Sequence, residues 1–469
     1  MEPCLSVLMS RRVRVSLHLA AFCFGLAMTR SANAIPAFAR KYGTSCQTCH
    51  TVYPKLNPFG EAFRHNGYRF PGVDSDYWKQ DTVPLGQEAQ KKTFPNSVWP
   101  GSLPGGPPLA FGFNGSALIH PDQNATGAQA DNGTIFTLQN LVAEAHLWAG
   151  GSYDDTITFW AEVTFSTETH NLDVEKAQVI INDWLGPKHA VNTIVGRGVA
   201  NLTSFGPHSS YIADTFLPSL PATALFGATS DSFNIGANYN FVEVNGVLWG
   251  RFIYNVGLTA GQHVDVRPTE NYYGHIGAKI GGMRLDGEGS SGPADATRPW
   301  AETALTLDAF AYRSVSHFTP AGAAPGDQPQ QDPATTFGGD IRGQLGSLEL
   351  TVGLYNESHD HAQMDGTGAS GLVQYSELSY ILFPWLVPAV RVEYIRLSPD
   401  NDTPVYDLRI MPGIAALVRP NIKVTLVGLI EHSNGAPPGG WGPVNGFIAP
   451  SMGAITEFEA ITLGLATAF

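Results

Sequence analysis

The chain has 469 residues, carries a formal net charge of −14 at pH 7 and contains four cysteines. An acidic chain is a poor partner for nucleic acid, because phosphates attract basic surfaces. The length also lets the chain bury a large apolar surface unaided, so its few cysteines are not the disulfide framework of a small secreted domain.

The first 34 residues have the pattern of a secretory signal peptide. A basic stretch at residues 11–14 precedes an apolar stretch at residues 15–28, and the small-residue site Ala32-Asn33-Ala34 follows. The apolar stretch is too short to span a bilayer, which argues against a transmembrane anchor. Cleavage after Ala34 removes four arginines and one glutamate, and it leaves 435 residues with a net charge of −17 and two cysteines.

Those two cysteines lie in the sequence Cys46-Gln47-Thr48-Cys49-His50. The spacing C-x-x-C-H is the attachment signature of haem c, in which two thiols bond the vinyl groups and the adjacent imidazole coordinates the iron. A thioredoxin-like pair would need a βαβ context, zinc would need a second ligand pair, and a plain disulfide would leave His50 unexplained. The sequence therefore predicts one covalent haem c, held by Cys46 and Cys49, with His50 as an axial ligand.

The ligand on the opposite face of the iron is open to alternatives. Cytochromes c often use methionine there, but residues 35–109 contain none, and their only other histidine is His65. Residues 59–65 predict a short helix whose Phe59, Ala62 and Phe63 share one face, which would cover the porphyrin. His65 is then either the second axial ligand or a solvated side chain. A methionine from farther along the chain remains an alternative: Met283, Met364, Met411 or Met452.

Residues 71–108 are rich in proline, glycine and polar residues, which predicts a linker or an irregular plug. After them the apolar residues alternate with a period of two, as at Leu348, Leu350, Val352 and Leu354. Such alternation indicates strands with one apolar and one polar face. About sixteen of these strands can be counted between residues 109 and 469. The strands of a soluble β-sandwich show the same alternation. The number of strands and the lengths of their connections therefore have to distinguish a sandwich from a membrane barrel.

The connections between these strands alternate in length. Short ones are predicted at residues 150–152, 186–188, 245–246, 346–347, 383–385 and 419–421, and long ones near 121–134, 200–230, 319–333, 359–370 and 434–451. One connection, at 286–298, is longer than its side of the membrane would suggest. This asymmetry, together with an alternating last strand that ends in Phe469, is typical of outer-membrane barrels. We predict a mainly β fold: a transmembrane barrel of about 16 strands (109–469) after a short monohaem cytochrome c segment (35–70).

The two parts together resemble a known family. The stretch IPAFARKYGTSCQTCH, the pattern P-x-L-N-x-F-G-x-x-F-R-x-N-G-Y and a porin-like β-domain resemble the fused cytochrome-porins, the group that contains outer-membrane iron oxidases. The specific residues are confined to about residues 35–68. The resemblance implies Cys46 and Cys49 as thioether links, His50 as axial ligand, and electron transfer from extracellular Fe(II) to a periplasmic acceptor such as a c-type cytochrome.

Two classes of function follow. The first is a redox conduit, an Fe(II)-oxidising c-type cytochrome; another extracellular donor, or electron flow outward to an acceptor, would use the same architecture. The second is a solute channel that carries the cytochrome segment as a plug. Either would lie in the lipid of the bacterial outer membrane, with the haem segment at the periplasmic side or within the barrel. The charge of −17 fits a lumen that attracts cations such as Fe²⁺.

A second, weaker metal-binding pattern lies in a predicted external loop. It consists of His359, Asp360, His361 and Asp365. Such a cluster is more often a solvated loop than a metal site.

Overall fold

The computed structural model describes residues 37–71, 82–84, 92, 102–104, 109–121, 134–137, 143–152, 156–167, 170–202, 210–212, 238–260, 270–288, 297–318, 330–363, 366–435 and 457–468. The predicted signal peptide, most of the predicted linker and Phe469 lie outside these residues. Two short linker strands, β3 (Thr82–Pro84) and β4 (Ser102–Pro104), pair with each other. No helix in the described ranges is long and apolar enough to cross a membrane.

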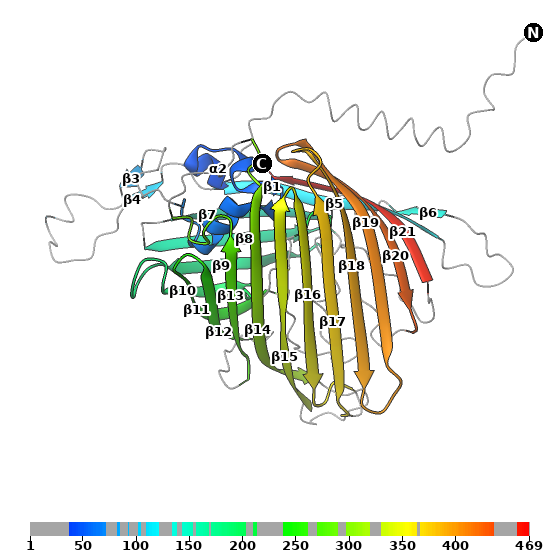
Figure 1. The fold of residues 1–469 in the computed structure, drawn as a ribbon. Helices are drawn as coiled ribbons and strands as arrows, with labels where there is room; N and C mark the ends of the chain where they lie inside the picture. Colours follow the sequence, from blue (N-terminus) through cyan, green and yellow to red (C-terminus); the bar gives the residue numbers. More distant parts are fainter. Residues whose placement is uncertain are drawn as a thin grey trace, which may run out of the picture.

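The main body of the molecule is a closed antiparallel barrel (Figure 1). Its strands are β5 (Leu109–Pro121), β6 (Thr134–Thr137), β7 (Glu144–Ser152), β8 (Ile157–Ser166), β9 (Leu172–Ile181), β10 (Asn192–Gly198), β11 (Tyr239–Leu248), β12 (Phe252–Thr259), β13 (Tyr272–Gly281), β14 (Glu302–Phe318), β15 (Gln330–Gly346), β16 (Leu348–His359), β17 (Ala369–Tyr380), β18 (Leu386–Pro399), β19 (Val405–Arg419), β20 (Ile422–Ser433) and β21 (Glu457–Ala468). Strands adjacent in sequence pair with each other, except that β6 and β7 both pair with β5, and β21 closes on β5.

The barrel wall has sixteen strand positions around its circumference. β6 pairs with the last residues of β5 and β7 pairs with the first residues of β5, so β6 and β7 together occupy one strand position beside β5. The seventeen described strands of the barrel therefore fill sixteen strand positions. The predicted count of about sixteen strands is confirmed.

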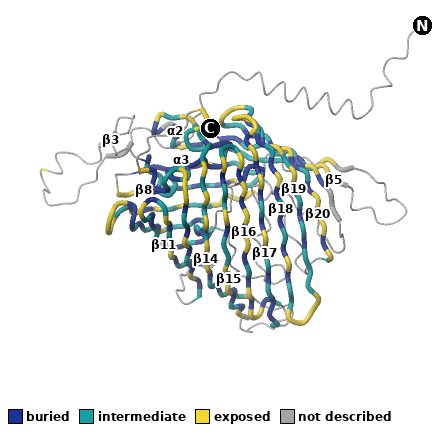
Figure 2. The backbone as a smooth tube through the Cα atoms, in the orientation of Figure 1, coloured by how far each residue is buried: buried dark blue, intermediate teal, exposed yellow. Residues whose placement is uncertain are grey.

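Large apolar residues point out of the barrel, as β16 illustrates. Leu350 and Leu354 are 44% and 50% exposed, whereas Glu349 and Thr351, on either side of Leu350, are buried. Figure 2 shows a similar alternation of exposed and buried residues along the other long strands. A soluble sandwich buries its apolar face, so this inverted pattern belongs to a barrel whose outer surface meets lipid. The prediction of a transmembrane barrel is confirmed.

Most of the predicted connections fall at or between strand ends. The short ones at 186–188, 346–347, 383–385 and 419–421 lie at one end of the barrel, and the strand ends that flank the long ones around 200–230, 359–370 and 434–451 lie at the other. Residues 150–152, predicted as a turn, are instead the last residues of β7. The strand there continues slightly farther than its glycines suggested.

The predicted turn at Asn245 and Gly246 is wrong. Both residues lie inside β11 and pair with β12, and the chain turns instead at Trp249 and Gly250, which both have positive φ. A Cβ atom on Gly246 would lie 1.9 Å from the carbonyl oxygen of Ala190. Glycine is needed at this position for a close approach of two backbones rather than for a turn.

The connection between β13 and β14 is long for its side of the barrel, as noted from the sequence. It spans residues 282–301, and its described part packs against the N-terminal segment. Met283 contacts an apolar cluster of that segment, and a Cβ atom on Gly287 would lie 2.2 Å from Cβ of Pro71. The described part of this connection therefore covers part of the N-terminal segment.

The N-terminal segment, residues 37–71, lies at the barrel end where β5 begins and β21 ends (Figure 1). It contains α2 (Ala37–Tyr42), the 3-10 turn η1 (Cys46–Thr48), β1 (His50–Val52), β2 (Lys55–Leu56) and α3 (Pro58–His65). α3 begins where it does because the side chain of Asn57 accepts a hydrogen bond from the Gly60 N–H and Pro58 occupies the first helical position. The predicted helix over residues 59–65 is confirmed.

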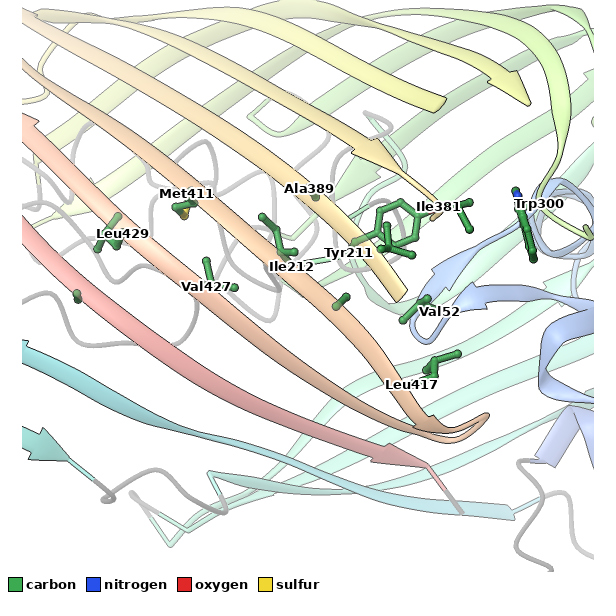
Figure 3. Packing of buried hydrophobic residues seen from close by; sticks show 13 residues of the cluster. Val52, Tyr211, Ile212, Trp300, Ile381, Ala389, Met411, Leu417, Val427 and Leu429 are labelled. Carbon is green, nitrogen blue, oxygen red and sulfur yellow. The ribbon is translucent and has the colours of Figure 1, made fainter. Parts of the chain in front are cut away.

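A connection from the opposite end enters the barrel interior. Tyr211 and Ile212, between β10 and β11, are buried in an apolar cluster with Val52 of β1 and Met411 of β19. Figure 3 shows these side chains beside the strands of the wall. The N-terminal segment and this connection therefore meet inside the barrel.

Candidate functional site

Cys46 and Cys49 lie on a tight turn beside a cavity. Cys46 begins η1, and the Cys49 N–H donates a hydrogen bond to the Cys46 carbonyl oxygen at 3.2 Å. Both thiols are free rather than joined in a disulfide. With His50 they line a cavity of about 690 Å³ between the N-terminal segment and the barrel wall. The fold thus brings all three residues of the predicted attachment motif to one cavity.

The imidazole of His50 is oriented by the backbone. Its Nδ1 donates a hydrogen bond to the carbonyl oxygen of Pro54 at 3.1 Å, which leaves Nε2 with the lone pair that a metal requires. Burial lowers the pKa of His50 to about 4, and it outweighs the hydrogen bonds to the backbone of Pro54 and Lys55 that raise this pKa. The ring is therefore neutral at pH 7 and has the tautomer of a metal ligand.

The surroundings of the two thiols discriminate between the alternatives for the motif. Burial raises the pKa of both, that of Cys49 to about 12. A redox-active C-x-x-C pair needs a lowered pKa, because the thiolate is the nucleophile. Within the described residues, no group of three potential ligands could hold a metal such as zinc. Two free thiols beside a neutral imidazole have the chemistry that a covalently attached haem requires.

Asn57 and Gly60 hold the cysteine turn against α3. The Asn57 side chain caps the helix and also donates hydrogen bonds to the carbonyl oxygens of Gln47 and Thr48 at 2.9 and 3.1 Å. A Cβ atom on Gly60 would lie 2.0 Å from the carbonyl oxygen of Cys49. Only glycine allows the helix to pass this close to the cysteine turn.

α3 turns a different face toward the cavity than predicted. Of the predicted apolar face, Phe63 lines the cavity, but Phe59 and Ala62 do not. Phe59 packs instead against Phe70, with ring centroids 4.9 Å apart, in the core of the N-terminal segment. Phe59 and Ala62 therefore lie away from the cavity, and of the predicted apolar face only Phe63 borders it.

Three further histidines line the cavity, and they differ in their partners. Nδ1 of His146 lies 3.0 Å from Oγ1 of Thr164. His275 is engaged at both ring nitrogens, with Nε2 3.0 Å from a carboxylate oxygen of Asp308. His65 has no hydrogen-bond partner in the described part of the chain. Burial lowers the pKa of His65 to about 4, so its ring is neutral.

No methionine among the described residues lines the cavity. Met283 packs against the apolar cluster of the N-terminal segment, which Cys49 also contacts. Met411 lies in the cluster that contains Val52. Met364 and Met452 lie outside the described residues. Of the candidates for the second axial ligand that the structure describes, His65 borders the cavity, whereas Met283 and Met411 do not.

Aromatic rings line the wall of the cavity next to the N-terminal segment. Phe38, Tyr68 and Trp160 stack on one another with centroid distances of 5.5 to 5.7 Å. Trp148 stacks on His146 at 5.2 Å. Both tryptophans are inward-facing residues of β7 and β8, so the barrel supplies half of this apolar lining.

Ion pairs tie the N-terminal segment to the barrel. The buried Lys55 pairs with Glu349 of β16, and Arg342 of β15 contacts Glu61 at 2.8 Å and Glu349 at 3.1 Å. Burial raises the pKa of Glu61, but the surrounding cations, Arg342 first and Arg64 next, together outweigh it and lower this pKa to about 2. A further pair joins Arg69 to Asp183 at 2.8 Å, in the connection between β9 and β10. The segment is docked on the wall rather than freely tethered.

The described residues of the second predicted cluster, His359, Asp360 and His361, do not form a group that could hold a metal ion. His359 is buried at the end of β16, where its Nδ1 lies 2.7 Å from Oδ2 of Asp332. The backbone N–H of His361 donates to the same carboxylate. Asp365 lies outside the described residues. His359 is therefore a paired residue of the wall and not a solvated loop side chain.

No family model matches the chain, and no curated protein matches its sequence. Among solved structures it is similar to an anion-selective porin from Comamonas acidovorans, at a TM-score of 0.50 and 12% identity over 77% of this chain and 98% of that one. It is also similar to OmpT of Vibrio cholerae (TM-score 0.47, 11% identity, 77% and 96%) and to the channel DcaP of Acinetobacter baumannii (0.42, 12%, 77% and 96%).

The likeness to the Comamonas porin concerns the fold alone. It agrees with the sixteen strand positions in the wall and with the apolar outer surface described above. The chain is a porin-like barrel of the bacterial outer membrane.

Proposed function

We propose that the protein is an outer-membrane electron conduit with residues 35–70 as a haem c segment, 71–108 as a linker and 109–469 as the barrel. Electrons would pass from extracellular Fe(II), or another donor, through the haem to a periplasmic acceptor such as a c-type cytochrome. The observation that carries the proposal is the common cavity of Cys46, Cys49 and His50, which the barrel wall helps to form. The resemblance of residues 35–68 to the fused cytochrome-porins supports it.

The physical need for a cofactor in this place is simple. A hydrocarbon layer of roughly 25–30 Å separates the two sides of the membrane. When bound, the haem would supply a one-electron iron couple inside the mouth of the barrel and shorten this gap. The acidic chain, at −17 after cleavage of the predicted signal peptide, favours the approach of cations such as Fe²⁺.

The residues of the chain have distinct tasks in this proposal. Cys46 and Cys49 bond the group covalently, and the Pro54 carbonyl holds the His50 ring so that Nε2 is free for iron. The stack of Phe38, Tyr68 and Trp160 excludes water from one side. His65 would hold the other face of the iron, because its ring is neutral and has no competing partner in the described part of the chain.

Electron transfer can be tested in liposomes that contain a trapped c-type cytochrome and an impermeable Fe(II) chelator. We expect Fe(II) added outside to reduce the trapped cytochrome, and His50→Ala to abolish this reduction. His432→Ala is the matched control, since His432 is an exposed residue near the opposite end of the barrel. Two outcomes would contradict the proposal. The first is reduction of the trapped cytochrome that persists in His50→Ala, and the second is reduction that occurs only in liposomes without the internal chelator.

Substitution of His65 tests the second axial ligand. We expect His65→Ala to convert a low-spin haem spectrum to a high-spin one, because the iron loses a strong-field nitrogen. Absorption and electron paramagnetic resonance spectra would show the change. His275→Ala should leave the spectrum low-spin, since Asp308 and Asn255 occupy that ring. A change in His275→Ala and none in His65→Ala would reassign the ligand.

A solute channel is the second candidate, and the barrel fold favours it. The Comamonas protein of similar fold is an anion-selective porin. Against free passage, the N-terminal segment and residues 210–212 meet inside the barrel in the cluster of Figure 3. Liposome swelling in small sugars separates the two functions. The conduit predicts swelling at the rate of empty vesicles, and rapid swelling would favour the channel.

A further inference from the structure

Four cationic side chains line the cavity, and three of them already have carboxylate partners. Lys279 lies 2.8 Å from a carboxylate oxygen of Glu302, and Lys176 and Arg342 are paired in the same way, with Glu162 and with Glu61 and Glu349, respectively. These charges are neutralised by the protein itself. These three side chains are therefore poor binding sites for a further anion.

Arg64 is the fourth cation, and its situation differs. It lies in the last turn of α3, half-buried, and its Nη2 donates a hydrogen bond to the amide oxygen of Asn201 at 2.9 Å. No carboxylate of the described residues forms an ion pair with it. Glu61, one turn earlier on the helix, forms its ion pair with Arg342, although the charge of Arg64 also contributes to lowering the pKa of Glu61. A neutral amide satisfies one N–H but cannot balance the charge of the guanidinium.

We propose that Arg64 binds a propionate group of the haem. This inference rests on the proposed haem site. A haem held by Cys46 and Cys49 brings two carboxylates into the cavity, where Arg64 is the described cation that lacks a carboxylate. The planar guanidinium has five N–H donors, and two of them can match the two oxygens of a carboxylate. Arg64 would therefore hold the group at a second point, in addition to its links to Cys46 and Cys49.

The charge of Arg64 also has a consequence for the haem potential. A cation beside the haem disfavours the oxidised state, which carries one more positive charge than the reduced state. The low dielectric of a half-buried site strengthens this effect. Loss of Arg64 should therefore lower the midpoint potential.

The test compares Arg64→Gln with Arg69→Gln. Arg69 is an arginine of the same segment that does not line the cavity, and glutamine can still donate to its partner Asp183. Haem content is measured by the pyridine haemochrome, the propionate by its bending band in resonance Raman spectra, and the potential by redox titration. We expect Arg64→Gln to keep its haem, shift the propionate band and lower the potential, and Arg69→Gln to match the wild type.

Arg64→Lys separates charge from geometry and serves if the glutamine variant fails to accumulate. A lysine keeps the charge but not the two-pronged contact, so the potential should stay near that of the wild type while the propionate band shifts. A wild-type band in either Arg64 variant would overturn the inference. If the wild-type protein carries no covalent haem, the proposed function fails instead, so the two failures are distinguishable.

Discussion

Replacing Cys49 by alanine is expected to abolish covalent haem in the purified protein. The cysteine bonds one vinyl group and ends the turn that places His50, so its loss leaves Cys46 as the single thioether link and disturbs the turn that presents both Cys46 and His50 to the group. Haem staining of denaturing gels and the pyridine haemochrome spectrum measure the effect. The expected change is loss of the stained band and of the haemochrome signal at equal protein.

Gln47→Ala is the matched control for Cys49→Ala. Gln47 is exposed on the same turn, and its backbone carbonyl, which the substitution keeps, accepts a hydrogen bond from the side chain of Asn57. This variant should retain full haem staining. Covalent haem at the wild-type level in Cys49→Ala would show that the motif has another use, and the conduit proposal would lose its basis.

Replacing Glu349 by leucine is expected to loosen the N-terminal segment from the barrel. The substitution leaves Lys55, which has no exposed surface, without its carboxylate partner, and it removes one of the two carboxylates of Arg342. Breaking a buried ion pair from one side costs about 3–5 kcal/mol. Hydrogen exchange of the amides in residues 46–66 should therefore accelerate roughly 100-fold or more.

The double variant Lys55→Met and Glu349→Leu tests the cause. It replaces both charges by apolar side chains of similar length, so no uncompensated lysine remains in the interior. Such replacements are often close to neutral. We expect slower exchange in the double variant than in Glu349→Leu alone. If both variants exchange alike, the docking depends on contacts other than this ion pair.

The local chemistry of the attachment motif could be predicted without a structure. Cys46, Cys49 and His50 are adjacent along the chain, and their spacing alone puts two thiols and an imidazole within reach of one group. The helix that ends at His65 was equally accessible, because Asn57, Pro58 and the apolar period are local signals. The sequence did not show which face of that helix is turned toward the cavity. Phe59 is buried because it packs against Phe70, and this contact forms only in the folded chain.

Local signals failed where a long-range contact decides the backbone. Asn245 and Gly246 have the sequence of a hairpin turn, but they lie inside β11 because the carbonyl of Ala190 packs against the glycine. The residues that line the cavity could not be predicted from the sequence either. Trp148, Trp160 and Arg342 are inward-facing positions of an alternating strand, and the alternation does not say which segment fills the barrel.

What the sequence by itself determined is therefore the kind of barrel and the predicted chemistry of its first segment. Two-residue alternation and sixteen strands follow from short-range patterns, because the pleat turns every second side chain outward and lipid selects the apolar ones. Only the tertiary structure decided that the segment is docked inside the mouth of the barrel. The ion pairs of Lys55 with Glu349 and of Glu61 with Arg342 join residues almost 300 positions apart, and no local pattern couples residues at that separation.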